Sequence, residues 1–207
     1  MNLIQQMDDF RRAVLAFYQS GHALQGLGGT SADHLAVVLD AIKDTLPLNT
    51  SHTAAQVPAT SYWPELIAQA AAPFDEIIRT AGHVADHFNW RINKSYLGIF
   101  EDRFFDNEAF VEVIGPNGLL ICDDCRVGFL ILGRDIYYPK HNHEATELYH
   151  TVIGTGLWSQ SDGPERPKAP NTAIYHEEWE NHTMRTTDPL LNLWSWTGAI
   201  GNEAQAS

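Results

Sequence analysis

The segment 133–154 contains the residues of this chain whose types and spacing are best suited to chemistry. His141, His143 and Glu147 follow the pattern H-x-H-x3-E, and Gly154 comes after six more residues. Residues two apart on a strand point to the same face, so His141 and His143 are expected to aim two imidazoles at one point. Glu147 follows a short turn and is expected to add a carboxylate from the neighbouring strand. Two neutral imidazoles and a carboxylate suit a divalent first-row metal ion, so the sequence predicts metal chemistry on a β scaffold.

The elements that position these residues fall into two parts with different periodicity. Up to about residue 90, apolar residues recur at helical spacing, with longer helices predicted over 10–18 and 31–46. Ser31 is the expected N-cap of the second helix. After about residue 97, short apolar runs separated by Gly and Pro are typical of a small antiparallel sandwich or barrel. The predicted fold is therefore α+β, with a helical N-terminal region over residues 1–96 and a β domain over residues 97–203.

One segment of the β region predicts a hairpin. Two apolar runs, 110–114 and 118–121, flank the turn sequence Gly115-Pro-Asn-Gly, which is a strand–turn–strand pattern. Cys122 and Cys125 follow it as Cys-Asp-Asp-Cys, and the sequence contains no second cysteine pair. They are therefore interpreted as ordinary thiols rather than as half of a zinc site.

The charge balance excludes two classes of partner. The chain carries 26 acidic and 13 basic residues, a formal net charge of −13, whereas non-specific nucleic-acid binding and docking on anionic membranes both select basic surfaces. No apolar run is long enough to span a bilayer, and the N-terminal residues lack the basic segment and apolar core of a signal peptide. The expected setting is the cytoplasm, and the expected partner is a small-molecule substrate.

The pattern in 133–154 resembles the first motif of the cupin superfamily. That motif runs Gly, about five residues, H-x-H, three or four residues, Glu, six residues and Gly. Here seven residues separate Gly133 from His141, which is slightly long, and the remainder fits. The resemblance implies that residues 97–203 form a single cupin domain, an antiparallel β jelly-roll barrel.

Cupins carry a second motif whose histidine completes the metal site from a later strand. The candidates for this fourth ligand are His176 and His182. His182 begins the strand-like run His-Thr-Met-Arg-Thr and lies 39 residues after His143, so it is preferred. The Pro-x-Gly turn expected in the second motif is absent; Pro170-Asn-Thr is the nearest sequence to it.

Two tyrosines are expected to face the metal cavity. Tyr149 lies two positions after Glu147, on the same strand face, and Tyr138 precedes the two histidines. A dication lowers the pKa of a nearby phenol because it stabilises the phenolate, and a tyrosinate can act as a general base at neutral pH. With the run 137–149 and the later His-Thr-Met-Arg-Thr, the chain resembles the cupin-type dimethylsulfoniopropionate lyases of marine bacteria.

This resemblance implies both an activity and a set of roles. Metal-dependent β-elimination would cleave dimethylsulfoniopropionate to dimethyl sulfide and acrylate, with Tyr149 as the base. The implied cofactor is one divalent transition metal, zinc, iron or manganese, without an organic cofactor. The implied ligands of that metal are His141, His143, Glu147 and His182.

The cationic end of this substrate also needs a binding site. A dimethylsulfonium group has no N–H donors, so aromatic faces suit it as they suit quaternary ammonium groups. Trp196, which shares a strand face with Trp194, and Tyr138 are the predicted substrate-binding residues.

Two other functions fit the same ligands. A cupin dioxygenase would use Fe(II) at this site and would depend on O₂, whereas a lyase works anaerobically. A non-enzymatic cupin would bind a small molecule without turnover and would use the helical region as an interaction module. In either case the helices are expected to cover one end of the barrel or to form a homodimer contact.

Overall fold

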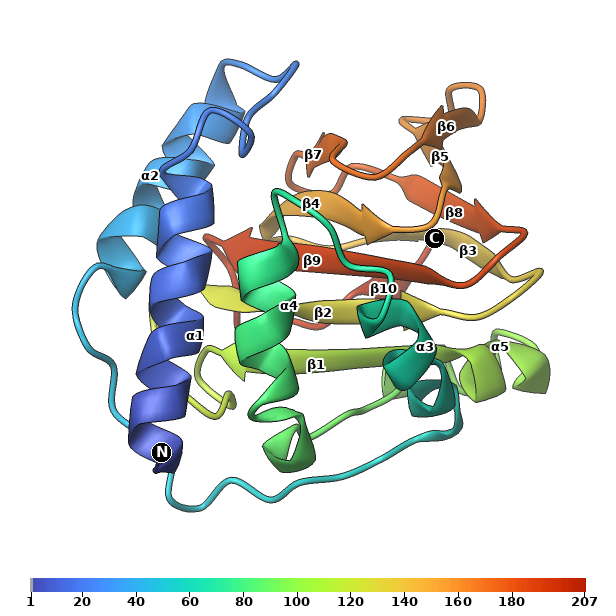
Figure 1. Ribbon diagram of the computed structural model, residues 1–207. Helices are drawn as coiled ribbons and strands as arrows, with labels where there is room; N and C mark the ends of the chain where they lie inside the picture. The colour runs from blue at the N-terminus through green and yellow to red at the C-terminus, as the bar shows by residue number, and fades with distance from the viewer. Residues whose placement is uncertain (1) are drawn as a thin grey trace.

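Helical segments fill the first half of the chain in the computed structural model, which describes residues 2–207 (Figure 1). The α-helices and short 3-10 segments (η) are α1 (Leu3–Tyr18), α2 (Thr30–Ile42), η1 (Pro58–Tyr62), α3 (Trp63–Ile67), α4 (Asp75–Gly82), η2 (Ala85–His87), η3 (Lys94–Tyr96) and α5 (Asp102–Asn107). The predicted N-cap of α2 was wrong. Gly29 caps this helix, and Ser31 lies inside the first turn, where its hydroxyl donates to the carbonyl oxygen of Gly28.

Ten strands follow and form two antiparallel sheets of five strands each. The strands are β1 (Glu108–Ile114), β2 (Arg126–Leu132), β3 (Tyr137–Asn142), β4 (Thr146–Ile153), β5 (Gly156–Gln160), β6 (Arg166–Lys168), β7 (Ala173–His176), β8 (His182–Thr186), β9 (Leu190–Thr197) and β10 (Gln205–Ala206). The first sheet has the order β1-β2-β9-β4-β7 and the second the order β10-β3-β8-β5-β6. Strands β2 to β9 pair in the pattern of a jelly roll, with β1 and β10 added at two edges. The predicted α+β fold, with helices before an antiparallel jelly roll, is confirmed.

The central strands of the first sheet are buried on both faces because two different cores lie against them. Every residue of β2 and of β9 is buried. Since side chains alternate along a strand, Phe129 and Leu193 face the helices, whereas Leu130 and Trp194 face the second sheet. The inner core between the two sheets also takes side chains from the second sheet, including Trp158 and Met184.

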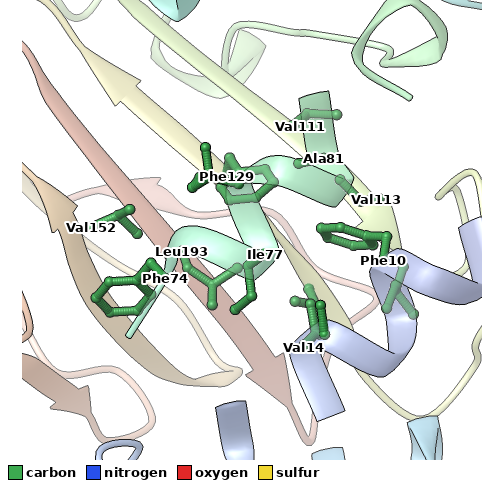
Figure 2. Packing of buried hydrophobic residues seen from close by; sticks show 14 of the residues in the cluster. Phe10, Val14, Phe74, Ile77, Ala81, Val111, Val113, Phe129, Val152 and Leu193 are labelled. Carbon is green, nitrogen blue, oxygen red and sulfur yellow. The ribbon is translucent and has the colours of Figure 1, made fainter. Parts of the chain in front are cut away.

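The outer core joins the helices to the first sheet. Figure 2 shows Phe10 and Val14 of α1 and Ile77 of α4 packed against Phe129 and Leu193 of the sheet. The aromatic rings of Phe10 and Phe129 lie 6.1 Å apart between centroids. The helices therefore cover the outer face of the first sheet and leave its inner face to the site (Figure 1).

Helix α2 is attached to the same sheet by a buried histidine. Nδ1 of His34 lies 2.9 Å from Oγ1 of Thr146, and its Nε2 lies 2.9 Å from Oγ of Ser195. Burial lowers the pKa of His34 to about 4, so the ring is neutral and bridges the two hydroxyls at physiological pH. This contact ties α2 to β4 and β9, next to residues that face the inner core.

The predicted hairpin at 110–121 did not form. The turn itself is present, since the backbone N–H of Gly118 donates to the carbonyl of Gly115. Beyond the turn, Leu120 makes only isolated bridges, with Leu48 and Ile114, and β1 pairs with β2 instead. The run after the turn serves the outer core, where Leu119 and Leu120 are buried.

Two further predictions concern the chain as a whole. Within residues 2–207, every helix is too short or too polar to cross a membrane. The boundary between a helical region 1–96 and a cupin domain 97–203 stays a prediction.

We expect the outer core to dominate stability. Replacing Phe10, which is fully buried on α1, with Ala should lower the free energy of unfolding by about 3–5 kcal/mol, because the cavity left behind is closed in by the sheet. Ile4→Ala on the same helix removes a side chain that is 61% exposed. This substitution should change the free energy of unfolding by less than about 0.5 kcal/mol. Urea unfolding followed by circular dichroism measures both. Equal losses would show that α1 does not depend on this core.

Candidate metal centre

Three of the predicted ligands lie together in the inner core. His143 follows the end of β3, Glu147 is on β4 and His182 begins β8, and all three side chains are buried. Nε2 of His143 lies 2.9 Å from Oε2 of Glu147, and Nε2 of His182 lies 3.8 Å from the same oxygen. One donor atom from each residue lies within 4.8 Å of the other two. This spacing allows the three atoms to bind one metal ion.

His141 lies beside this group but outside it. It pairs with His182 across β3 and β8, and the centroids of their two rings are 4.0 Å apart. Its other face stacks on Tyr138, with ring centroids also 4.0 Å apart and planes inclined by 9°. The role of His141 as a ligand stays a prediction.

The rejected candidate His176 also lies at the site. It is paired with Glu147 across β7 and β4, and its ring stacks on that of His182 at 3.9 Å. Its Nε2 is buried and has no hydrogen-bond partner among residues 2–207. Both candidates for the second-motif ligand, His176 and His182, therefore lie next to Glu147 in the structure, although the sequence favoured His182 alone.

The rings of the three predicted histidine ligands are oriented by backbone carbonyls. In each ring Nδ1 lies within hydrogen-bond distance of a carbonyl oxygen two residues away. The pairs are His141 with Pro139 (2.8 Å), His143 with Ala145 (2.7 Å) and His182 with Glu180 (2.9 Å). A carbonyl oxygen only accepts, so Nδ1 carries a proton in each ring. In His143 and His182, Nε2 is the atom that lies near Glu147.

Burial and neighbouring charges set the protonation of the group. Burial lowers the pKa of His141 to about 3 and holds the pKa of His182 well below its usual value. For His143, burial also opposes the charged form, but the Glu147 carboxylate outweighs it and raises the pKa. Burial likewise opposes the charged form of Glu147, but His143 outweighs it and lowers the pKa. Each member of the His143–Glu147 pair thus favours the charged form of the other.

These donors fit a divalent cation. Nε2 of His182 is buried, and among the described residues 2–207 it has no hydrogen-bond partner. A buried polar atom without a partner is unfavourable, and a cation bound between His143, Glu147 and His182 would provide one. Imidazole nitrogens with a carboxylate oxygen are the donor set that zinc, iron(II) and manganese accept.

Trp196 holds the second oxygen of the central carboxylate. Its indole N–H donates to Oε1 of Glu147 at 2.6 Å, because the two residues are paired across β9 and β4. The indole also lies against the ring of His143, with centroids 4.4 Å apart. The sequence predicted Trp196 as a substrate-binding residue; its bond to Glu147 is a contact that the sequence did not indicate.

A cavity opens beside the ligands, between the two sheets. It contains about 440 Å³ of empty space, its open mouth included. Its lining comprises Asn93, Glu108, Phe110, Arg126, Leu130, Tyr138, Glu147, Tyr149, Trp194, Trp196, Glu203 and Ala204. Four of the predicted site residues, Tyr138, Glu147, Tyr149 and Trp196, therefore share one cavity.

The two tyrosines occupy this cavity in different ways. The hydroxyl of Tyr138 donates to the hydroxyl of Tyr96 at 3.1 Å. Tyr149 lies on β4 two residues after Glu147, as predicted, and is buried. Burial, with the carboxylate of Glu147 as a further cause, raises the pKa of Tyr149 well above its usual value. Positive charge next to Glu147 would counteract this effect.

Trp194 lines the cavity, and its indole lies close to a residue without a side chain. It is paired with Gly128 across β9 and β2. A Cβ atom at Gly128 would lie 2.8 Å from Cζ2 of Trp194 and would also clash with the backbone of β1. The glycine therefore sets the position of this indole.

Comparison with known proteins identifies the family. The family model for dimethylsulfoniopropionate (DMSP) lyase matches residues 30–192. The chain belongs to the DMSP lyase family. It is 29% identical over 138 residues to the DMSP lyase DddQ of Ruegeria pomeroyi, which covers 66% of this chain and 67% of that protein. It is 29% identical over 93 residues to a putative DMSP lyase, DddL, of Cereibacter sphaeroides, which covers 44% of this chain and 39% of that protein.

Solved structures of DMSP lyases share the fold of this family member. A chain from the crystal structures of RdDddP and RnDddQII superposes with a TM-score of 0.76 at 22% identity, covering 98% of both chains. The crystal structure of DddQ from Ruegeria pomeroyi superposes with a TM-score of 0.72 at 22% identity, covering 91% of this chain and 98% of that one.

We expect Glu147 to be essential for metal binding. Glu147→Gln keeps the hydrogen bond from Trp196 but removes the charge, and it should weaken Zn²⁺ binding about 100-fold or more. The matched control is Glu144→Gln, in the turn just before β4. Competition between the protein and a chelating dye measures the affinity. Tight binding by Glu147→Gln would remove Glu147 from the ligand set.

Proposed function

We propose that this protein is a metal-dependent lyase that cleaves dimethylsulfoniopropionate to dimethyl sulfide and acrylate by base-catalysed β-elimination. The observation that carries the proposal is that Tyr149 lies two residues after Glu147 on β4, and that both line one small cavity. A metal-binding carboxylate and a candidate base therefore face the same bound molecule. Membership of the DMSP lyase family supports the choice of substrate.

The proposed ligands are His143, Glu147 and His182, with His141 as the fourth. The metal is one divalent ion, zinc, iron or manganese. When bound, it supplies positive charge that draws electron density from the substrate carboxylate and stabilises a phenolate nearby. In each histidine, the hydrogen bond from Nδ1 to a backbone carbonyl fixes the orientation of the ring, so that Nε2 is the atom available to bind the metal.

Tyr149 is the proposed base. Its phenolate oxygen takes a proton from the carbon next to the substrate carboxylate. The electrons of that C–H bond form the C=C bond of acrylate, and the C–S bond breaks with its electron pair leaving on sulfur as neutral dimethyl sulfide. The proton then passes from the phenol to solvent. The inner core around Tyr149, including Trp158 with its ring centroid 6.0 Å away, excludes water from the reacting atoms.

Trp196 and Tyr138 are the proposed contacts of the substrate. The N–H of Trp196 is already used by Glu147, so the ring is the part of Trp196 that a substrate can contact, beside His143 and Arg126, which also lie against it. The hydroxyl of Tyr138 is used by Tyr96, which leaves the part of its ring that does not stack on His141. Aromatic faces without free donors suit a methylated cation.

We also propose that the protein acts in the cytoplasm on a small molecule, and that its helical region contributes a homodimer contact. Val37 on α2, which is 43% exposed, is an apolar side chain that such a contact would cover.

The activity is tested by gas chromatography of the headspace. Purified protein loaded with Zn²⁺, Mn²⁺ or Fe²⁺ and incubated anaerobically with dimethylsulfoniopropionate should release dimethyl sulfide, because elimination needs no oxidant. Chelator-treated protein should release little. Product that forms only in air would favour the cupin dioxygenase, and no product with any of the three metals would remove the substrate assignment.

Replacing the proposed base should separate chemistry from metal binding. Tyr149→Phe should retain the metal at wild-type stoichiometry while kcat falls by about 100-fold or more, since general-base catalysis contributes on that order. Tyr137→Phe, at a residue 43% exposed on the neighbouring strand β3, is the matched control and should keep full activity. Steady-state kinetics with metal analysis gives both quantities. An active Tyr149→Phe protein would rule out the proposed mechanism.

A further inference from the structure

One buried carboxylate at the cavity takes no part in metal binding. Glu108, the first residue of β1, lines the cavity and is 1% exposed. Among residues 2–207, its Oε2 has no hydrogen-bond partner. Burial raises the pKa of this carboxyl to about 8, and a backbone hydrogen bond from Asn93 only partly opposes the rise. A carboxyl group kept in this state inside a ligand cavity suggests that the ligand provides its partner.

The neighbouring arginines do not neutralise Glu108, because both are directed to Glu112, two residues further along β1. Nε of Arg126 lies 3.5 Å from Oε2 of Glu112, and a guanidinium nitrogen of Arg91 lies 3.7 Å from the same oxygen. Oε1 of Glu112 accepts from the backbone N–H of Asn117 at 2.6 Å. Both guanidinium groups are thus directed to Glu112, and among residues 2–207 neither forms an ion pair with Glu108.

The surroundings of Glu108 specify the kind of cation. Phe110, Tyr138, Trp194 and Trp196 line the same cavity, and aromatic faces attract cations but accept no strong hydrogen bonds from N–H donors. The guanidinium of Arg91 lies over Phe110 at 5.1 Å and that of Arg126 over Trp196 at 5.6 Å, which leaves Tyr138 and Trp194 as the rings of this set without an arginine over them. A carboxylate among such faces favours a compact cation covered by methyl groups. A primary amine would leave most of its N–H donors without acceptors, which is unfavourable in a buried site.

We infer that Glu108 is the counterion of the substrate's sulfonium group and determines the specificity of the cavity for a methylated cation. This inference rests on the proposed function and adds a residue to it. Glu108 on β1 and Glu147 on β4 stand at the two sides of one cavity, with β2 and β9 between them in the sheet. In this arrangement the cationic end of the bound zwitterion is directed to the Glu108 side of the cavity and its carboxylate to the Glu147 side. Two acidic residues then recognise the two ends differently, since only Glu147 belongs to the metal site.

The test compares two unreactive ligands that differ in one atom. Dimethylsulfonioacetate carries the cation but lacks the second carbon needed for elimination, and 3-methylbutanoate replaces its S⁺ with CH. Calorimetry on Zn²⁺-loaded wild-type protein should show about 10-fold tighter binding of the sulfonium compound. In Glu108→Gln this preference should fall to about 2-fold or less, while the affinity for 3-methylbutanoate stays the same.

Two variants distinguish recognition of the cation from support of the fold. Glu108→Asp keeps the charge and should retain a preference for the sulfonium ligand. Glu101→Gln, at an exposed residue before α5, should behave as wild type. Equal weakening of both ligands in Glu108→Gln, or no preference in wild type, would overturn the inference.

The outcome is separable from that of the headspace assay. A protein that releases dimethyl sulfide but shows no preference for the sulfonium ligand keeps the lyase and excludes Glu108 as its counterion. A protein with a preference that depends on Glu108, but without release, keeps the cation site and excludes the lyase. In active protein, Glu108→Gln should raise KM about 10-fold with kcat changed by less than about 2-fold.

Discussion

The candidate site depends on keeping one carboxylate, that of Glu147, charged inside the molecule. Removing an ion from water costs several kcal/mol unless other groups replace the lost hydration. Here His143 and the indole N–H of Trp196 each bond one oxygen. These partners come from the turn after β3 and from β9, while the histidines of β7 and β8 complete the surroundings. Strands from both sheets must therefore meet at this point, and the two-sheet sandwich achieves it.

The same strands also carry the core that holds the helices. On β9, Leu193 packs under α1 and α4, whereas Trp194 and Trp196 on its other face line the cavity. His34 of α2 bonds Ser195 between the two tryptophans and Thr146 directly before Glu147. The helical region is thus more than a cover for the sheet, because its contacts fix the strand positions from which the site residues project.

The sequence could predict the parts of the site that depend on short-range spacing. His143 and Glu147 are four residues apart and meet as expected, and the period of two places Tyr149 on the face of Glu147. Contacts between strands that are far apart in the sequence could not be predicted in this way. The pairing of Glu147 with both His176 and Trp196 depends on the registers of β7 and β9 against β4, and no local pattern contains that information.

Two other features show why local patterns were insufficient. The turn at Gly115 formed, but the run after it makes only backbone hydrogen bonds around Leu120 with the end of β1, and its apolar side chains pack into the outer core. Glu108 belongs to no motif in the sequence, because its burial is decided by the jelly roll that forms after it. The fold class could be predicted from the periodicity and the motif, whereas the full set of residues that line the cavity could be identified only from the three-dimensional structure.

The alternation of side chains on β4 and β9 limits how the chain can change in length. Inserting one residue into either strand would exchange its faces. Leu193 would then enter the cavity, and Trp194 would be pressed against the helices. Insertions and deletions are therefore compatible with this architecture in the surface loops, such as that between β5 and β6, but not within residues 146–152 or 190–197. A change of length in either segment would therefore disturb both the outer core and the site, since both faces of these strands are buried.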